Sequence, residues 1–243
     1  MSRQTPRLRM FAGPNGSGKS TIKDGLPAKL IGVYVNPDEL EATVRRNGRL
    51  PLEPFGVTAG DAEAREWFTS SAFLRKNGLA EATVAVSCRG DIIDFGGVAV
   101  NSYHASVLAD FLRRKLIAAR VSFSFETVMS APDKVDLLRE ARAAGFRTYL
   151  YYVAIDNPAI NVARVRSRVA QGGHDVPEPK IVERYHRSLG LLREAIRHTD
   201  RAYLFDNSAT EPTFLGEVTA GRTIELQSDE MPNWFKSAVW DKF

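Results

Sequence analysis

Apolar and polar positions along the chain predict strands and helices in alternation. Short apolar runs between turn residues indicate buried strands, and apolar residues three or four apart indicate helices with one buried face. The strands are expected at residues 8–12, 32–35, 121–126, 147–155 and 202–205, with an edge strand at 223–226. The helices are expected at residues 19–30, 39–46, 61–76, 102–120, 132–144, 158–171, 180–199 and 234–240. This alternation predicts a three-layer α/β fold, in which helices cover a mostly parallel central sheet.

One segment departs from this alternation. Short β-type runs at 83–87, 91–95 and 98–101 are separated by Arg89-Gly90 and Gly96-Gly97, which favours hairpins over a crossover unit. No long Pro- or Ser-rich linker divides the chain. We therefore expect a single domain over residues 1–243, with a β-type insertion at about 55–119 and a C-terminal extension at 209–243.

The first predicted strand leads directly into a phosphate-binding motif. The pattern GxxxxGK[ST] follows the strand and opens a predicted helix, which is the context that a P-loop requires. In such a loop the backbone N–H groups surround the phosphates, the lysine reaches the outer phosphates and the hydroxyl joins a magnesium shell. The residues expected to hold the nucleotide are Gly13, Pro14, Asn15, Gly16, Ser17, Gly18, Lys19, Ser20 and Thr21. The motif therefore predicts a bound nucleoside triphosphate with Mg²⁺, and Ser20 as a metal ligand.

Composition narrows the class of protein only a little. The chain has 243 residues, of which 44% are hydrophobic and 26% charged, and its net charge is +4, as expected of a globular protein that binds phosphates. Its single cysteine, Cys88, cannot form an internal disulfide, and no apolar run approaches the length of a membrane span. We expect a cytoplasmic protein with no membrane contact.

Two carboxylates follow predicted strands, at the sheet edge where α/β proteins bind their ligands. Asp38 follows the second strand and suits a general base for an acceptor hydroxyl, but it also suits the N-cap of a helix that begins at Glu39. Glu126 ends the third core strand and suits a contact to metal-bound water or to a substrate hydroxyl, or an ion pair with a nearby arginine. Their positions leave these alternatives open.

Arginines flank a predicted Gly-Gly loop. Arg164 and Arg168 share one helix face, and Arg184 lies on the next helix, beyond the loop at 172–177. Arginines of a mobile lid commonly stabilise the transferred phosphoryl group, but a solvated basic helix face is the simpler interpretation of the same pattern.

Two further segments are weaker candidates. Asn207 follows the last core strand, where nucleotide kinases commonly place a loop against the adenine, although turn formation explains the segment equally well. The cluster Arg113-Arg114-Lys115 is interpreted as the solvated face of a helix.

Five segments in this order resemble the zeta-toxin family of P-loop kinases. They are 13–21 with the P-loop, 36–40 with Asn-Pro-Asp-Glu-Leu, 124–127 with Ser-Phe-Glu-Thr, 172–177 with Arg184-Tyr185, and 200–202 with 206–208. The resemblance is interrupted between about 55 and 119, where the β-type runs replace a segment that looks shorter and helical in close relatives.

The resemblance implies ATP-dependent phosphorylation of a small hydroxyl-bearing substrate, in the toxins a UDP-linked amino sugar. It makes Asp38 the base, Lys19 and Ser20 the phosphate and magnesium residues, and Glu126 with Thr127 the substrate contacts. Arg168 and Arg184 fit the lid arginines best, with Arg164 as the alternate. Toxicity does not follow, because many relatives look like plain kinases, and an antitoxin-type protein partner stays an open alternative.

The predicted function is that of a P-loop kinase that phosphorylates an alcohol group of a small metabolite. One alternative is a polynucleotide 5′-hydroxyl kinase or nucleic-acid-processing ATPase, which the basic cluster at 113–115 permits, although nucleic acid is the less favoured partner. Another is a non-catalytic ATP-binding regulatory module whose insertion contacts a partner.

Overall fold

The computed structural model describes residues 5–173 and 175–243. The chain divides into two compact units. The first unit runs to Gly32 and resumes from Ser124 to Phe243, and the second unit is Val33–Phe123. The predicted insertion at about 55–119 lies within the second unit, and the single-domain organisation stays a prediction.

The first unit is built on the central sheet. Its strands are β1 (Arg7–Ala12), β6 (Phe123–Thr127), β7 (Arg147–Ala154), β8 (Arg201–Asp206), β9 (Thr213–Thr219) and β10 (Thr223–Leu226). They follow one another in the order β10-β9-β8-β7-β1-β6. β7 pairs in parallel with β1 and β8, whereas β9 and β10 are antiparallel. The predicted α/β fold with a mostly parallel central sheet is confirmed.

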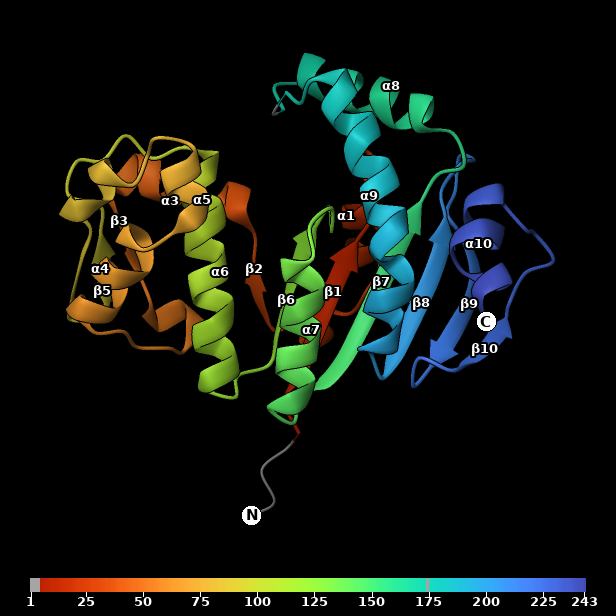
Figure 1. Cartoon of the computed structure of the whole chain (residues 1–243), viewed down its shortest axis with the longest axis horizontal. Helices are drawn as coiled ribbons and strands as arrows, with labels where there is room; N and C mark the ends of the chain where they lie inside the picture. The colour runs from red at the N-terminus through yellow and green to blue at the C-terminus, as the bar shows by residue number, and fades with distance from the viewer. Residues whose placement is uncertain (1–4, 174) are drawn as a thin grey trace. The chain divides into compact units, whose positions relative to one another are not determined.

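The helices of the first unit lie between these strands in sequence, except for the last helix, which follows the last strand. They are α1 (Lys19–Asp24), α2 (Ala28–Ile31), α7 (Asp133–Ala143), α8 (Pro158–Ala170), α9 (Glu178–Arg197) and α10 (Asn233–Ala238), followed by the 3₁₀ turn η3 (Trp240–Lys242). Figure 1 shows α7 and α9 crossing one face of the sheet. Among the residues described, no helix in either unit is long and apolar enough to cross a membrane.

Alternating side chains of the parallel strands form the core of this unit. Leu8 and Met10 of β1, Leu150 of β7, and Ala202 and Leu204 of β8 are all fully buried. Because successive side chains of a strand point to opposite faces, this spacing places them on one face of the sheet. Burial of each large side chain contributes about 1.5–3 kcal/mol, so the face anchors the strands whose ends carry the candidate site.

Two predictions for the first unit were wrong in detail. The helix expected at 19–30 is interrupted between α1 and α2, where Gly25 caps the first and Pro27 precedes the second. Pro27 cannot donate to a continuing helix, which explains the break. The strand β9 was not predicted, because Gly216 and the polar residues around it weaken the strand pattern. Gly216 is needed there, since a Cβ atom would lie 2.5 Å from the Glu225 carbonyl oxygen.

The second unit combines short helices with a small antiparallel sheet. Its elements are β2 (Val33–Val35), α3 (Pro37–Asn47), β3 (Arg49–Pro51), η1 (Glu53–Phe55), α4 (Asp61–Thr69), α5 (Ala72–Lys76), η2 (Glu81–Ala85), β4 (Ser87–Arg89), β5 (Ile92–Asp94) and α6 (Ser102–Ala118). The small sheet has the order β3-β5-β4, and both of its pairings are antiparallel. The predicted hairpin around Arg89-Gly90-Asp91 is therefore present.

Several boundaries in this unit differ from the prediction. The helix expected at 61–76 is two helices, because Ser71 caps α5 through the Leu74 N–H. Residues 81–85 form a 3₁₀ turn, and 98–101 contain no strand. Asn101 caps α6, since its side-chain oxygen accepts from the Tyr103 N–H at 3.0 Å. Local side-chain hydrogen bonds thus overrode the apolar pattern at these points.

The basic cluster at 113–115 is not the solvated face that its sequence indicates. The Arg113 side chain is only 2% exposed. Arg114 contacts Asp110 at 3.3 Å and lies over the Trp67 ring, and Lys115 contacts Glu63 at 2.8 Å. Because these charges are buried or engaged, the cluster offers little free positive surface to a phosphate backbone.

Candidate nucleotide-binding site

The loop between β1 and α1 adopts a conformation that its glycines alone permit. Gly13, Gly16 and Gly18 have φ angles of 144°, 73° and 94°, values that other residues rarely adopt. A Cβ atom on Gly13 would lie 2.0 Å from the Val153 carbonyl oxygen. The backbone of the loop is therefore pressed against the end of β7, and its shape is set before any ligand binds.

Two buried amides hold this loop from outside the motif. Asn207, directly after β8, donates from Nδ2 to the Ser17 carbonyl at 2.8 Å, and Asn161 of α8 donates to the Asn15 carbonyl at 2.7 Å. Asn207 is a predicted site residue, and its described contact is to the loop itself. Asn161 was not predicted, because a single Asn on an amphipathic helix gives no signal in sequence that it faces a loop so distant along the chain.

Lys19 lies at the centre of the candidate site. Its Nζ donates to the carbonyl oxygens of Gly13 and Pro14, both at 3.0 Å. Burial lowers the pKa of Lys19 from 10.5 to about 8, the nearby charge of Glu126 opposes this effect, and the charge of Arg168 adds to it. The ammonium group is thus solvated by loop carbonyls and held in a place where an added anion would stabilise its charge.

Ser20 and Glu126 face each other across the site. The Ser20 hydroxyl donates to Glu126 Oε2 at 3.2 Å, so the end of β6 meets the start of α1. Both groups are oxygen donors of the kind that Mg²⁺ prefers. Within the residues described, no cluster of three or more His, Cys, Asp or Glu side chains could hold a metal by itself. The neighbouring Thr127 hydroxyl accepts from the Met129 N–H at 3.0 Å and shapes the turn after β6.

The three predicted lid arginines have different surroundings. Arg168 lies close enough to Lys19 for its charge to lower the pKa of that residue. Arg164 donates to the Ala209 carbonyl at 3.2 Å. Arg184 is half-buried, and its side chain makes no hydrogen bond or ion pair with any residue in the described ranges. Of the three arginines, Arg168 is thus the one whose charge acts on Lys19 of the P-loop.

The helices that carry these arginines pack against each other. Val162 and Val165 of α8 pack with Ile181 of α9 in a buried apolar cluster. In the predicted Gly-Gly loop, the N–H groups of Gly172 and Gly173 donate to the Val169 and Arg168 carbonyls and end α8. His174, between the helices, lies outside the described residues.

Asp38 belongs to the second unit, where its local setting decides between its two predicted roles. The helix α3 starts at Pro37, and Asn36 caps it by accepting from the Asp38 N–H at 2.9 Å. The N-cap alternative for Asp38 is therefore wrong. Its carboxylate is exposed and accepts no hydrogen bond from the part of the chain that the structure describes, so it is free to bind an external group.

A buried polar network joins the end of the chain to the site. Asp206, one residue before Asn207, accepts from Trp234 Nε1 at 2.7 Å and from the Ser208 N–H at 2.9 Å. Asp156, after β7, accepts from the Trp234 N–H at 2.9 Å. The helix α10 in the predicted C-terminal extension therefore fixes the segment that supports the P-loop.

The sheet and the loop together form a P-loop kinase-like fold. Residues 98–210 match the model of the Zeta toxin family, which confirms the resemblance predicted from the sequence. The match covers the strand with Glu126, the helices with the three arginines and the loop with Asn207. The P-loop and Asp38 lie outside the matched segment, so their assignment depends on their own residues.

Individual relatives are distant. A curated protein from Haemophilus influenzae, described as uncharacterized, is 29% identical over 93 residues, which are 38% of this chain and 59% of that protein. A crystal structure of AvrRxo1-ORF1:-ORF2 with ATP has a TM-score of 0.54 at 15% identity. The similarity covers 99% of this chain and 64% of the matched chain. A native structure of that complex has a TM-score of 0.54 at 16% identity. The similarity covers 92% of this chain and 61% of the matched chain. The chain thus spans less than two thirds of these relatives, and the solved structures support the fold.

Proposed function

We propose that this protein is a kinase that transfers the γ-phosphoryl group of ATP, with Mg²⁺, to a hydroxyl group of a small metabolite. The observation that carries the proposal is the arrangement of Lys19 and the Ser20–Glu126 pair on a preformed P-loop. The Zeta toxin match supports the kinase class, and the similar structure solved with ATP supports the choice of nucleotide.

The donor half of the reaction uses the loop and its cations. Backbone N–H groups of the P-loop bind the phosphates, and Lys19 exchanges the Gly13 and Pro14 carbonyls for the outer phosphate oxygens. Arg168, whose charge already acts on Lys19, stabilises the negative charge of the phosphoryl group as it moves. Arg184, half-buried without an ion-pair partner among the residues described, is the second arginine of this role.

Ser20 and Glu126 fit a magnesium site when nucleotide is present. Their oxygens lie 3.2 Å apart, so the two side chains would together hold the ion or a water bound to it. The ion would neutralise negative charge on the phosphates. Glu126 and Thr127 are also the proposed substrate contacts, as in the family resemblance.

Asp38 is the proposed general base. Its carboxylate takes the proton of the acceptor hydroxyl while that oxygen bonds to the γ-phosphorus and the bond from this phosphorus to the β–γ bridging oxygen breaks, releasing ADP. We expect Asp38→Asn to leave ATP affinity unchanged and to lower turnover by about 10²- to 10⁴-fold. Isothermal titration with ATP and steady-state rates on the identified acceptor measure the two effects, and a near-normal rate would reject the base assignment.

The acceptor belongs to the class of small hydroxyl-bearing metabolites, with a nucleotide sugar such as a UDP-linked amino sugar as the specific candidate. The test is to incubate the protein with Mg-ATP and a cytosolic metabolite extract and to search by mass for species that gain one phosphoryl group. Lys19→Ala is the matched control, because it keeps the loop and removes its charge. If no species gains a phosphoryl group with either protein although ATP binds tightly, the regulatory ATP-binding module replaces the kinase.

The polynucleotide kinase alternative is weakened by the engagement of the cluster at 113–115. Oligonucleotide binding with a strong salt dependence would restore it. A protein partner is a further part of the proposal, since the similar AvrRxo1 structure is a complex of ORF1 with ORF2. Co-purification of a second protein with the tagged chain from a cell extract tests it.

A further inference from the structure

A basic pocket lies at the edge of the sheet where β7 and β8 begin. It has a volume of about 660 Å³, and its cationic lining residues are Arg142, Arg193, Arg197, Arg222 and Lys242. They come from the ends of α7 and α9, from the β9–β10 turn and from η3. The P-loop follows the opposite, carboxyl end of β1, which runs parallel to β7, so within this unit the basic pocket is separate from the nucleotide site.

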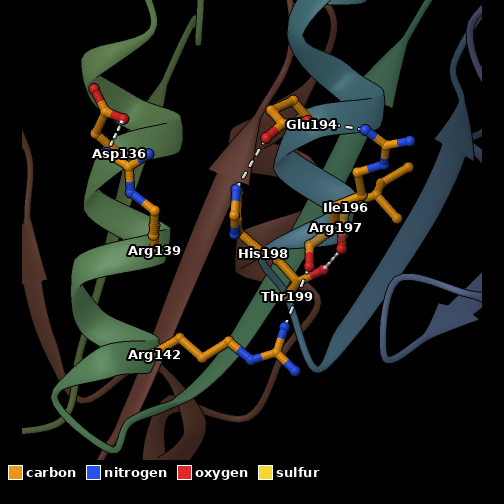
Figure 2. Close-up of polar contacts among 8 residues, drawn as sticks. All are labelled: Asp136, Arg139, Arg142, Glu194, Ile196, Arg197, His198 and Thr199. Carbon is orange, nitrogen blue, oxygen red and sulfur yellow. Dashed lines mark hydrogen bonds and ion pairs between the residues drawn. The ribbon is translucent and has the colours of Figure 1, made fainter.

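Two of the cations are engaged by the protein itself. Arg142 donates to the Arg197 carbonyl at 3.2 Å, and its other nitrogen is 4.0 Å from Asp200. Arg197 contacts Glu194 at 3.4 Å, and Figure 2 shows these side chains around the end of α9. Cations at a helix C-terminus are stabilised by the exposed carbonyls, so this pair has a sufficient structural explanation.

The other three cations have no such explanation. Arg193, Arg222 and Lys242 make no side-chain hydrogen bond or ion pair with any residue in the described ranges. Like charges that converge from separate elements repel one another, and dispersed surface positions would cost less. Their convergence in one concave site therefore creates a positive potential that a bound anion would neutralise.

The wall between these cations is closely packed. Ala220 has a φ angle of 53°, an uncommon value for a residue with a side chain, and its N–H donates to the Asp200 carbonyl at 2.8 Å. A Cβ atom on Gly221 would lie 2.8 Å from Arg197 Cα. The β9–β10 turn is thus pressed onto the end of α9, which fixes the backbone of Arg222 next to the pocket.

We propose that the basic pocket binds a small anion with two or more phosphate groups. The planar guanidinium group suits paired phosphate oxygens, and three unengaged cations call for a multiply charged ligand. The volume falls in the range of small-molecule sites, about 300–1,000 Å³, which suits a phosphorylated metabolite better than a protein segment.

The test uses inorganic tripolyphosphate as the probe and Lys19→Ala as the background, so that the P-loop contributes little binding. We expect Arg193→Ala with Arg222→Ala to weaken binding measured by titration calorimetry by about 100-fold, roughly tenfold per residue. Arg187→Ala is the matched control on α9, because Arg187 is paired with Glu183 and does not line the pocket. Thermal unfolding without ligand verifies that each variant is folded.

Three outcomes overturn the proposal. Tripolyphosphate binding that is absent, or equal in the double variant and the control, removes the site. Tighter binding of citrate than of tripolyphosphate makes it a carboxylate site instead. Binding of an acidic peptide but not of tripolyphosphate makes it a protein contact. ADP and ATP titrations, compared with tripolyphosphate, then separate a nucleotide from another polyphosphate as the source of the phosphates.

Discussion

The two edges of the parallel sheet in the first unit concentrate positive charge in different ways. At the carboxyl ends of the strands, the P-loop offers backbone N–H groups whose position is fixed by glycines and by the buried amides of Asn161 and Asn207. At the opposite edge, the basic pocket offers side chains from separate elements, three of them unengaged among the residues described.

Because of this difference, the two sites should respond differently to substitution. The P-loop depends on the close approach of its backbone to neighbouring segments, so a single added side-chain atom alters its shape. A side-chain pocket depends on the sum of several long, adaptable groups, so each substitution removes only its own share. Substitutions at the two edges probe that contrast.

Gly13→Ala should be the most damaging. The added Cβ atom would lie 2.0 Å from the Val153 carbonyl oxygen at a φ angle of 144°, so we expect loss of nucleotide binding and a free energy of unfolding lower by about 3–5 kcal/mol. Differential scanning calorimetry should find the melting temperature lower by roughly 10 °C. Gly190→Ala is the control, because nothing lies within 4 Å of its added atom, and equal behaviour of the two variants would contradict the close-approach argument.

Asn207→Ala removes one of the two amides that hold the cradle. The Ser17 carbonyl would lose its donor, which should cost about 1–3 kcal/mol of unfolding free energy. We also expect ATP to bind about tenfold more weakly, because the loop would be less ordered before binding. Asn207→Asp sharpens the test, since a carboxylate of the same size cannot donate to Ser17. Its affinity should be no better than that of the Ala variant, and wild-type affinity in both would show that the amide is dispensable.

The sequence predicted the parts of this site that depend on local pattern. The P-loop, the strand that ends at Glu126 and the arginines of α8 and α9 all follow from short motifs and helical spacing. The support by Asn161, the burial of Arg113 and the strand β9 depend on which distant segments meet, and a single amide or arginine gives no sign of its partner. The sequence left the N-cap role of Asp38 open, because Asn36 and Asp38 are both good caps; in the structure Asn36 is the cap, with Pro37 as the first residue of α3.

The lowered pKa of Lys19 predicts that ATP binding at the P-loop edge of the sheet depends on pH. With a pKa near 8, the lysine loses its proton above that pH in the free protein, whereas bound phosphates favour the charged form, so ATP binding takes up a proton. Affinity should therefore fall above about pH 8, by at most tenfold per pH unit. Calorimetric titrations of ATP from pH 7 to pH 10 measure this.

Lys19→Arg is the control for that dependence, because arginine stays charged throughout this range. The lowered pKa of Lys19 also affects folding, in the direction opposite to that of a lysine whose pKa is raised in the folded protein. Between pH 8 and 10.5 the unfolded chain holds the Lys19 proton that the folded protein has lost, so this group makes the free energy of unfolding rise with pH. A flat affinity profile for the unmodified protein would refute the lowered pKa.

Ala220→Gly should have the smallest effect, and it concerns the opposite edge. Relief of the left-handed backbone at a φ angle of 53° should raise the free energy of unfolding by about 0.5–1 kcal/mol. Ala144→Gly is the control, because Ala144 caps α7 at a φ angle of −77°, where glycine should destabilise. Chemical denaturation of the two variants measures both changes, and a loss of stability in Ala220→Gly would mean that the turn is not strained.

The support of the P-loop by Asn161 and Asn207, with Asp206 held by Trp234, also has a consequence for biosynthesis. A ribosome releases the loop first and its supports last. At about 5–20 residues per second, the interval from residue 13 to residue 207 is roughly 10–40 s, during which the nascent chain carries the motif without the amides that shape it. Nucleotide binding should therefore mature only as the last strands and α10 emerge, so that a chain broken off early would carry the motif but little of its function.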